Sequence, residues 1–254
     1  MLTVRNEIRR AVLSPRFIAA VIAFSILIII QDFSTVFEVF DSREFRGYEF
    51  HITFLINALK KDGFMFMLPV FSSLVYTSSF MSELKNGFIK SYLPRTKQSP
   101  YISGKLVSSA VSGFLVVFIS IMLSEVFCYY LFRSKEYSAY SDASQNGIHM
   151  SVLVMSALRC SFIGMLSAVF GLTMSLVFMN QYMAFASPFI MHYILIIINE
   201  RYYDSLYVFY PAEWIRPSQV WPGGDAGLIA FIVCLAGAVS MIYWFIASRR
   251  LQDV

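Results

Sequence analysis

Long apolar runs separated by short charged segments dominate the pattern of this chain. A bilayer-spanning helix needs about 20 mostly apolar residues. Runs that approach this length are Phe17–Gln31 (extending past Asp32 toward Val39), Phe64–Ser82, Leu106–Ser124 and Ala226–Ser248. A further stretch, Cys160 to Asn199, has no charged residue and is long enough for two crossings at ~1.5 Å per residue. We place a tight turn at its most polar dipeptide, Asn180-Gln181, so the pattern predicts six spans.

The first residues predict a separate amphipathic helix, within residues 1–14, that lies in the membrane interface. Its apolar and charged side chains fall on different arcs of a helix: Val4, Ile8, Ala11 and Val12 against Glu7, Arg9 and Arg10. Ser14-Pro15 then has the character of an N-cap followed by proline at the first helical position, so we expect the first span to begin there. We expect this start to belong to the mature protein, because it is too charged for a removable signal peptide.

Composition and charge agree with a membrane protein. Hydrophobic residues make up 57% of the chain and charged residues 14%, against roughly 25% charged in soluble domains, and the mean hydropathy is +0.63. With both termini inside, the inner segments hold 11 basic and 3 acidic residues, whereas the other side holds 9 basic and 13 acidic. This asymmetry is the positive-inside pattern. It predicts a multi-pass protein of the cell membrane, which we interpret as bacterial, with both termini cytoplasmic. Attraction of the basic residues to anionic lipid explains the net charge of +4, so no nucleic-acid partner is needed to explain it.

The inner loop of residues 82–105 predicts a short amphipathic helix. Leu84, Phe88 and Tyr92 recur at helical spacing, and Pro94 ends the pattern. Such a helix could place its apolar side chains in a groove on a soluble partner, or it could lie on lipid headgroups. The periodicity supports both interpretations equally.

Three features together resemble the permease subunit of type-2 ABC transporters, the exporter class. The segment NEIRRAVLSPRF resembles the interfacial helix that leads into the first span of that family. The inner loop resembles its coupling-helix region, and the long outer segment resembles the place of its short re-entrant helices. The inner-loop positions that carry the resemblance are Glu83, Gly87, Lys90, Leu93, Tyr101 and Lys105.

The resemblance implies an all-α membrane domain, covering residues 1–254, that docks on a separate cytoplasmic ATPase and pairs with a second permease, identical or not. It implies docking contacts from Glu83, Leu84, Lys85, Gly87, Phe88, Lys90, Tyr92, Leu93 and Arg95. It also implies that the second and fifth spans line the transport pathway, where the aromatic candidates are Phe64, Phe71, Tyr76, Phe185, Phe189 and Tyr193. Ordinary packing or lipid contact is the alternative for these six residues.

The sequence itself argues against ATP hydrolysis by this chain. A P-loop needs glycine-backed amides and a lysine followed by Ser or Thr. Gly104-Lys105 is followed by Leu106, with Ser99 in place of the first glycine. We therefore expect no cofactor on this chain, and ATP and Mg²⁺ on the partner.

The outer segment, residues 199–225, is rich in aromatic residues and proline. It either forms a re-entrant cap over the exit of a pathway or contributes an aromatic belt at the interface. Glu125 and Arg159 fall near the outer ends of consecutive spans, so we expect an ion pair between them, or else a substrate or gating contact. Cys128 and Cys160 are expected to be buried free thiols, with a disulfide between them as the alternative.

Small residues recur every four positions on three spans and predict close helix packing, within the chain for most of them, with dimerisation as the alternative. They are Ser109 and Gly113 in the third span, Ser167, Gly171 and Ser175 in the fourth, and Ala230, Cys234 and Ala238 in the sixth.

The apolar and aromatic interior favours export of a hydrophobic or amphipathic cargo such as a peptide, lipid or drug. A non-transporting membrane scaffold, or an immunity protein that sequesters toxic peptides, is the alternative function. An intramembrane enzyme is disfavoured, because His51, His149 and His192 are scattered and no HExxH or G-x-S-x-G motif occurs.

Overall fold

The computed structural model describes residues 2–41, 46, 49–87, 98–136, 150–202 and 207–252. All regular elements of these residues are helices, and one isolated β-bridge joins Arg46 to Glu136. The all-helical fold expected from the sequence is therefore confirmed for this part of the chain.

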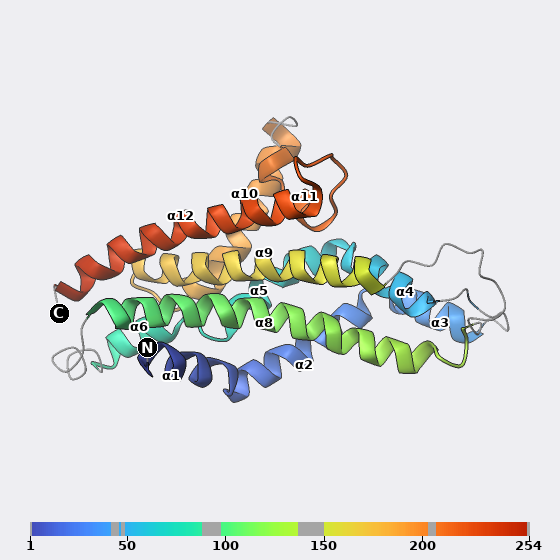
Figure 1. The fold of residues 1–254 in the computed structure, drawn as a ribbon, viewed down its shortest axis with the longest axis horizontal. Helices are drawn as coiled ribbons and strands as arrows, with labels where there is room; N and C mark the ends of the chain where they lie inside the picture. Colours follow the sequence, from blue (N-terminus) through green and yellow to red (C-terminus); the bar gives the residue numbers. More distant parts are fainter. Residues whose placement is uncertain are drawn as a thin grey trace.

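Three long helices form the body of the molecule: α8 (Gln98–Phe132), α9 (Met150–Val177) and α12 (Gly224–Gln252). They run along the long axis, while α1 (Leu2–Val12) and α2 (Pro15–Ile30) lie along α8 (Figure 1). Both chain ends lie at the same end of the bundle, together with α6 (Ser79–Lys85), and we refer to this as the terminal end (Figure 1). Helices α3 (Phe33–Asp41) and α4 (Phe50–Leu59) lie at the opposite end.

Among the described residues, four helices are long and apolar enough to cross a membrane: α8, α9, α12 and α10 (Met183–Tyr202). The number rises to six if two bent helix pairs each form one span. These pairs are α1 with α2, bent by 49°, and α5 (Asp62–Leu74) with α6, bent by 41°. The structure thus shows a membrane-type helical protein with four to six candidate spans.

Two local predictions are confirmed at helix ends. The Ser14 hydroxyl accepts a hydrogen bond from Phe17 N at 3.2 Å and donates one to Ala11 O at 2.9 Å, so one side chain closes α1 and caps α2. Between α9 and α10 the chain turns at residues 178–182, where Asn180 Oδ1 accepts a hydrogen bond from Tyr182 N at 3.0 Å. This is the turn that the polar dipeptide predicted.

Small residues bring the long helices close together, as predicted for two of the three spans. A Cβ on Gly113 of α8 would lie 2.8 Å from Gly164 O of α9, and one on Gly171 would lie 2.3 Å from Ala184 O of α10. In α12 the prediction is wrong within this chain. Ala230, Cys234 and Ala238 point away from the bundle and are exposed.

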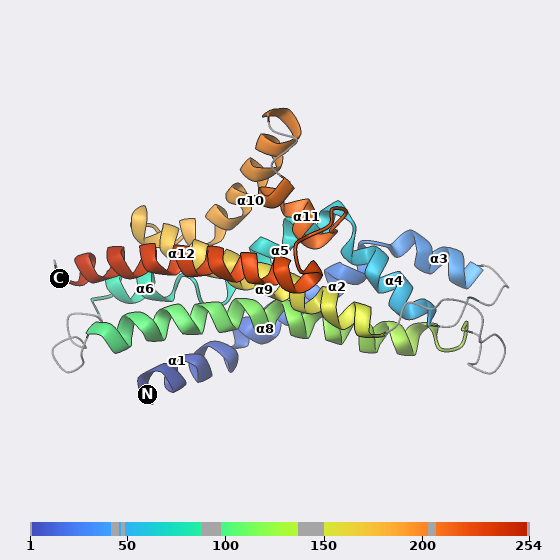
Figure 2. The same cartoon turned by 45° about the horizontal axis from the view of Figure 1, so that its top comes forward.

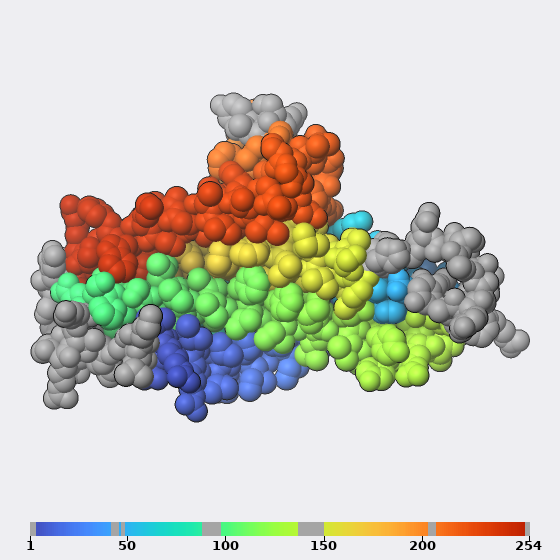
Figure 3. All heavy atoms as spheres, viewed as in Figure 1, coloured from blue at the N-terminus to red at the C-terminus, as the bar shows by residue number. Residues whose placement is uncertain are grey.

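Helix α10 departs from the bundle. It contains Pro188, which removes a backbone hydrogen bond and favours a kink, and its second half rises steeply from the axis (Figures 1 and 2). The segment that follows folds back to reach α12, and this part of the molecule stands out from the side of the bundle (Figure 3).

The segment between the first and second spans differs from the sequence expectation. The first span was expected to continue past Asp32 toward Val39, but α2 ends at Ile30, and the buried Asp32 carboxylate pairs with Lys61 Nζ at 3.2 Å. Helices α3 and α4 follow, and α4 was not predicted. The second span is also interrupted, because residues 75–78 form a turn between α5 and α6.

Candidate functional site

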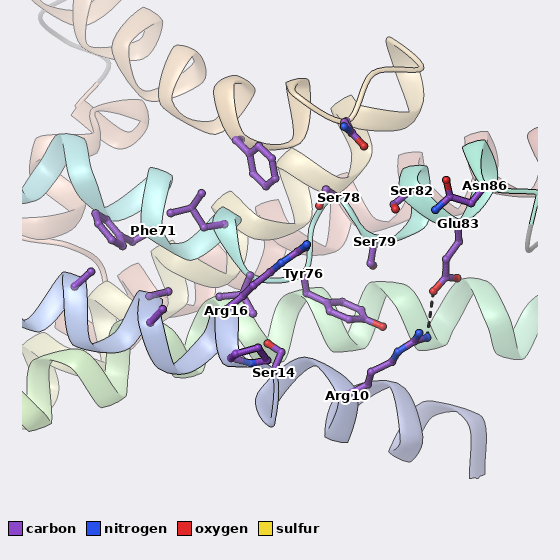
Figure 4. A pocket seen from close by; sticks show the side chains of 18 of the residues that line it. Arg10, Ser14, Arg16, Phe71, Tyr76, Ser78, Ser79, Ser82, Glu83 and Asn86 are labelled. Atoms are coloured by element: carbon purple, nitrogen blue, oxygen red, sulfur yellow. Dashed lines mark hydrogen bonds and ion pairs between the residues drawn. The ribbon is translucent and has the colours of Figure 1, made fainter.

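A groove at the terminal end lies between α2 and the α5–α6 segment, with α1 and the start of α10 at its sides (Figure 4). Its volume is about 1250 Å³. The α2 wall includes Ala19, Ala20 and Ala23, whose side chains end at Cβ. Phe71, which also lines the groove, stacks on Phe24 of α2 at 4.9 Å between ring centroids.

Three of the six predicted pathway residues converge on this groove: Phe71, Tyr76 and Phe185. They come from α5, from the turn after it and from α10, which the resemblance assigned to the second and fifth spans. The other three lie elsewhere. Phe64 is 1% exposed and stacks on Phe24 at 5.6 Å inside the core, whereas Phe189 and Tyr193 stack on each other on an exposed face of α10.

A buried ionic cluster adjoins the groove and joins three helices. Lys105 of α8 is fully buried, and its Nζ lies 2.9 Å from Glu7 Oε2 of α1 and 2.7 Å from Glu83 Oε1 of α6. The Tyr76 hydroxyl lies 3.2 Å from the same ammonium and also contacts Glu7. Tyr101 donates to Glu83 Oε2 at 2.8 Å. We refer to these five residues as the Lys105 cluster.

Arg10 extends the Lys105 cluster to the edge of the groove. Its guanidinium lies 3.4 Å from Glu83 Oε1, as drawn in Figure 4. A buried charge pair of this kind is retained only when hydrogen bonds satisfy the remaining atoms, and here two tyrosine hydroxyls do so. The cluster therefore fastens the interfacial helix α1 to both α6 and α8.

Only some of the predicted docking residues lie in the part of the chain that the structure describes. Glu83, Leu84 and Lys85 form the last turn of α6, and Gly87 follows with φ +70, a left-handed conformation that favours glycine. Leu84 packs inward against buried residues of α6, α8, α9 and α12. Five docking residues lie outside the described residues: Phe88, Lys90, Tyr92, Leu93 and Arg95.

The predicted ion pair between Glu125 and Arg159 is wrong. Glu125 Oε1 instead lies 3.2 Å from His51 Nε2, because the unpredicted helix α4 packs beside α8. Arg159 pairs with Asp225 and donates to Ile215 O at 3.3 Å, because the outer segment folds over α9. Each charge therefore has a partner that sequence spacing did not indicate.

The described part of the outer segment, residues 199–202 and 207–225, is folded. It contains the 3₁₀ turn η2 (Tyr207–Phe209) and the short helix α11 (Pro211–Ile215). Trp214 is 1% exposed and donates from Nε1 to Val208 O at 2.8 Å, and Trp221 is also buried. The buried Glu213 carboxylate accepts Ser218 N at 2.8 Å and holds the following turn.

All three cysteines are free thiols, with Cys128 and Cys160 buried as expected. Comparison of the chain with protein-family models, with curated proteins and with solved structures finds no match.

Proposed function

We propose that this chain is the membrane-spanning permease subunit of an ATP-driven transporter of the ABC exporter class. In this proposal a separate cytoplasmic ATPase binds at the terminal end, and a second permease subunit completes the pathway. The cargo is hydrophobic or amphipathic.

The Lys105 cluster is the observation that carries the proposal. The predicted docking segment begins in α6, and Glu83 of α6 shares the Lys105 ammonium with Glu7 of α1. A force applied to the segment after α6 would therefore move α1, α6 and the start of α8 as one unit. Alternating access needs such a connection, because the energy is supplied at a distance from the pathway.

The groove gives the proposal a second support. Movement of α6 and α1 would change the walls of the groove directly, since Arg10 of α1 and Glu83 of α6 both line it. In this proposal the ATPase binds on one side of the Lys105 cluster and the cargo contacts the groove on the other side. Movement caused by docking therefore reaches the cargo site through the cluster.

Co-purification tests the docking assignment. We expect the tagged chain, extracted from its native membrane in mild detergent, to retain an ATPase subunit. Lys85→Glu combined with Gly87→Pro should weaken this complex by at least tenfold while leaving membrane insertion intact. The proline cannot adopt φ +70, and the glutamate reverses a charge in the last turn of α6.

Lys60→Glu is the matched control, because Lys60 is exposed at the end of α4, away from the terminal end. The control variant should bind the ATPase as the wild type does. If the ATPase complex and transport survive replacement of the whole segment 83–95, the docking assignment is wrong. A chain that inserts normally and never retains an ATPase would instead favour the scaffold or immunity function.

A further inference from the structure

The groove has two chemically different parts. Its polar part holds Arg10 and Arg16 with one acidic residue, Glu83, together with several serine hydroxyls. Its apolar part runs between Ala19 and Ala23 of α2 and Phe71 of α5. A ligand that fills both parts must itself be amphipathic.

The polar part of the groove contains a positively charged group that is free to bind an anion. Arg16 is exposed and has no hydrogen-bond or ion-pair partner among the described residues, and its side chain extends from α2 across the groove toward the α5–α6 segment (Figure 4). A guanidinium without a partner at the side of an apolar groove favours a charge-assisted hydrogen bond to an anion such as a phosphate group.

The apolar part is accessible from the lipid side. Ala19 and Ala23 are exposed, and their neighbours Ile18 and Ile22 are 55% and 50% exposed on the same helix. Side chains of this kind on a membrane helix face acyl chains. The volume of about 1250 Å³ is larger than the roughly 300–1,000 Å³ of most small-molecule pockets.

We propose that the groove binds an anionic phospholipid. Its phosphate lies at Arg16, with Arg10 at the rim, and an acyl chain lies along Ala19, Ala23 and Phe71. The ligand enters sideways from the leaflet at the terminal end. This inference deepens the proposed function by naming a cargo class for the same groove, and it rests on that proposal only for the transport step.

Native mass spectrometry of the full chain tests the site without any ATPase. The chain is incubated with phosphatidylglycerol or phosphatidylcholine of equal chain length, and the bound lipid is measured over a concentration series. We expect phosphatidylglycerol to bind about fivefold more tightly than phosphatidylcholine, the increment expected from one arginine at a membrane surface.

Arg16→Gln should remove this preference, whereas Arg249→Gln, at the same end of the bundle on α12, should keep it. Ala19→Phe with Ala23→Phe should reduce binding of both lipids by filling the apolar part, whereas Ala230→Phe on the exposed side of α12 should not. These substitutions are at exposed positions, so folding is retained and is verified by size-exclusion chromatography.

Competition separates the two sources of an anionic group. A short-chain phosphatidylglycerol should displace bound lipid, and inorganic phosphate at the same concentration should not. Equal binding of both lipids to the wild type, an equal effect of the Arg16 and Arg249 substitutions, or displacement by inorganic phosphate would each overturn the inference. Loss of the ATPase complex with lipid preference retained would overturn the proposed function alone.

Discussion

The ammonium group of Lys105 is fully buried between two carboxylates, so its removal leaves negative charge without compensation. Removing one partner of a buried ion pair costs roughly 3–5 kcal/mol. We therefore expect Lys105→Met to lower the free energy of unfolding by about that amount in detergent, measured by SDS or thermal denaturation. Arg216→Met is the control, since Arg216 pairs with Asp62, whose side chain is 77% exposed, and exposed pairs contribute about 1 kcal/mol or less. Equal losses in the two variants would show that the Lys105 cluster does not hold α1 to the bundle.

His51 offers a second test at the residue scale, through pH. Its ring lies between Glu136, 2.8 Å from Nδ1, and Glu125, 3.2 Å from Nε2, with Glu49 nearby. Burial by itself lowers the pKa of His51, but the hydrogen bond and charge of Glu136 and the charges of Glu125 and Glu49 raise the pKa above the usual 6.5. The stabilisation by protonated His51 is therefore complete below about pH 6.5 and is lost as the pH rises through the higher folded-state pKa.

The expected result is a melting temperature that falls for His51→Gln at pH 6, with a difference from the wild type that shrinks as the pH is raised toward 9. His192→Gln is the matched control, because the His192 ring contacts Pro188 O and the Trp214 ring and has no acidic partner among the described residues. A pH-independent difference for His51→Gln would mean that His51 acts by packing alone.

At the scale of the elements, local signals predicted what local contacts determine. The Ser14 cap and the Asn180 turn were predictable because each depends on residues within a few positions. The helix α4 was not, since its ten residues are too short for a span and its polar anchor joins His51 to Glu136, 85 positions apart. A similarly long separation in sequence, between His51 and Glu125, explains the wrong partner for Glu125.

The groove shows a similar division between what could and could not be predicted. The aromatic residues of the second and fifth spans drew attention to Phe71, Tyr76 and Phe185, but periodicity could not separate them from Phe64, which packs in the core. Three alanines of α2 line the groove, and alanine carries no chemical signal in a sequence. Lys105 and Glu83 were noted for their positions in the loop, while the burial of Lys105 and its second partner, Glu7, depend on the packing of α1.

For the whole molecule, the placement of both termini, α6 and the start of α8 at one end makes the membrane topology testable. The basic side chains at that end predict that it is cytoplasmic. We expect a membrane-impermeant maleimide to label Arg133→Cys in intact cells and to label Asn86→Cys only after permeabilisation. Both positions are exposed and lie at opposite ends of the bundle.

The labelling is made in a Cys234→Ser background, since Cys128 and Cys160 are buried and should not react. Cell integrity is verified with a cytoplasmic marker protein. Labelling of Asn86→Cys from outside would place α6 and the groove on the external face, where no ATPase could reach them. The docking surface and the leaflet assigned to the phospholipid depend on the same orientation, so this result would remove both together while leaving the Lys105 cluster intact as a structural feature.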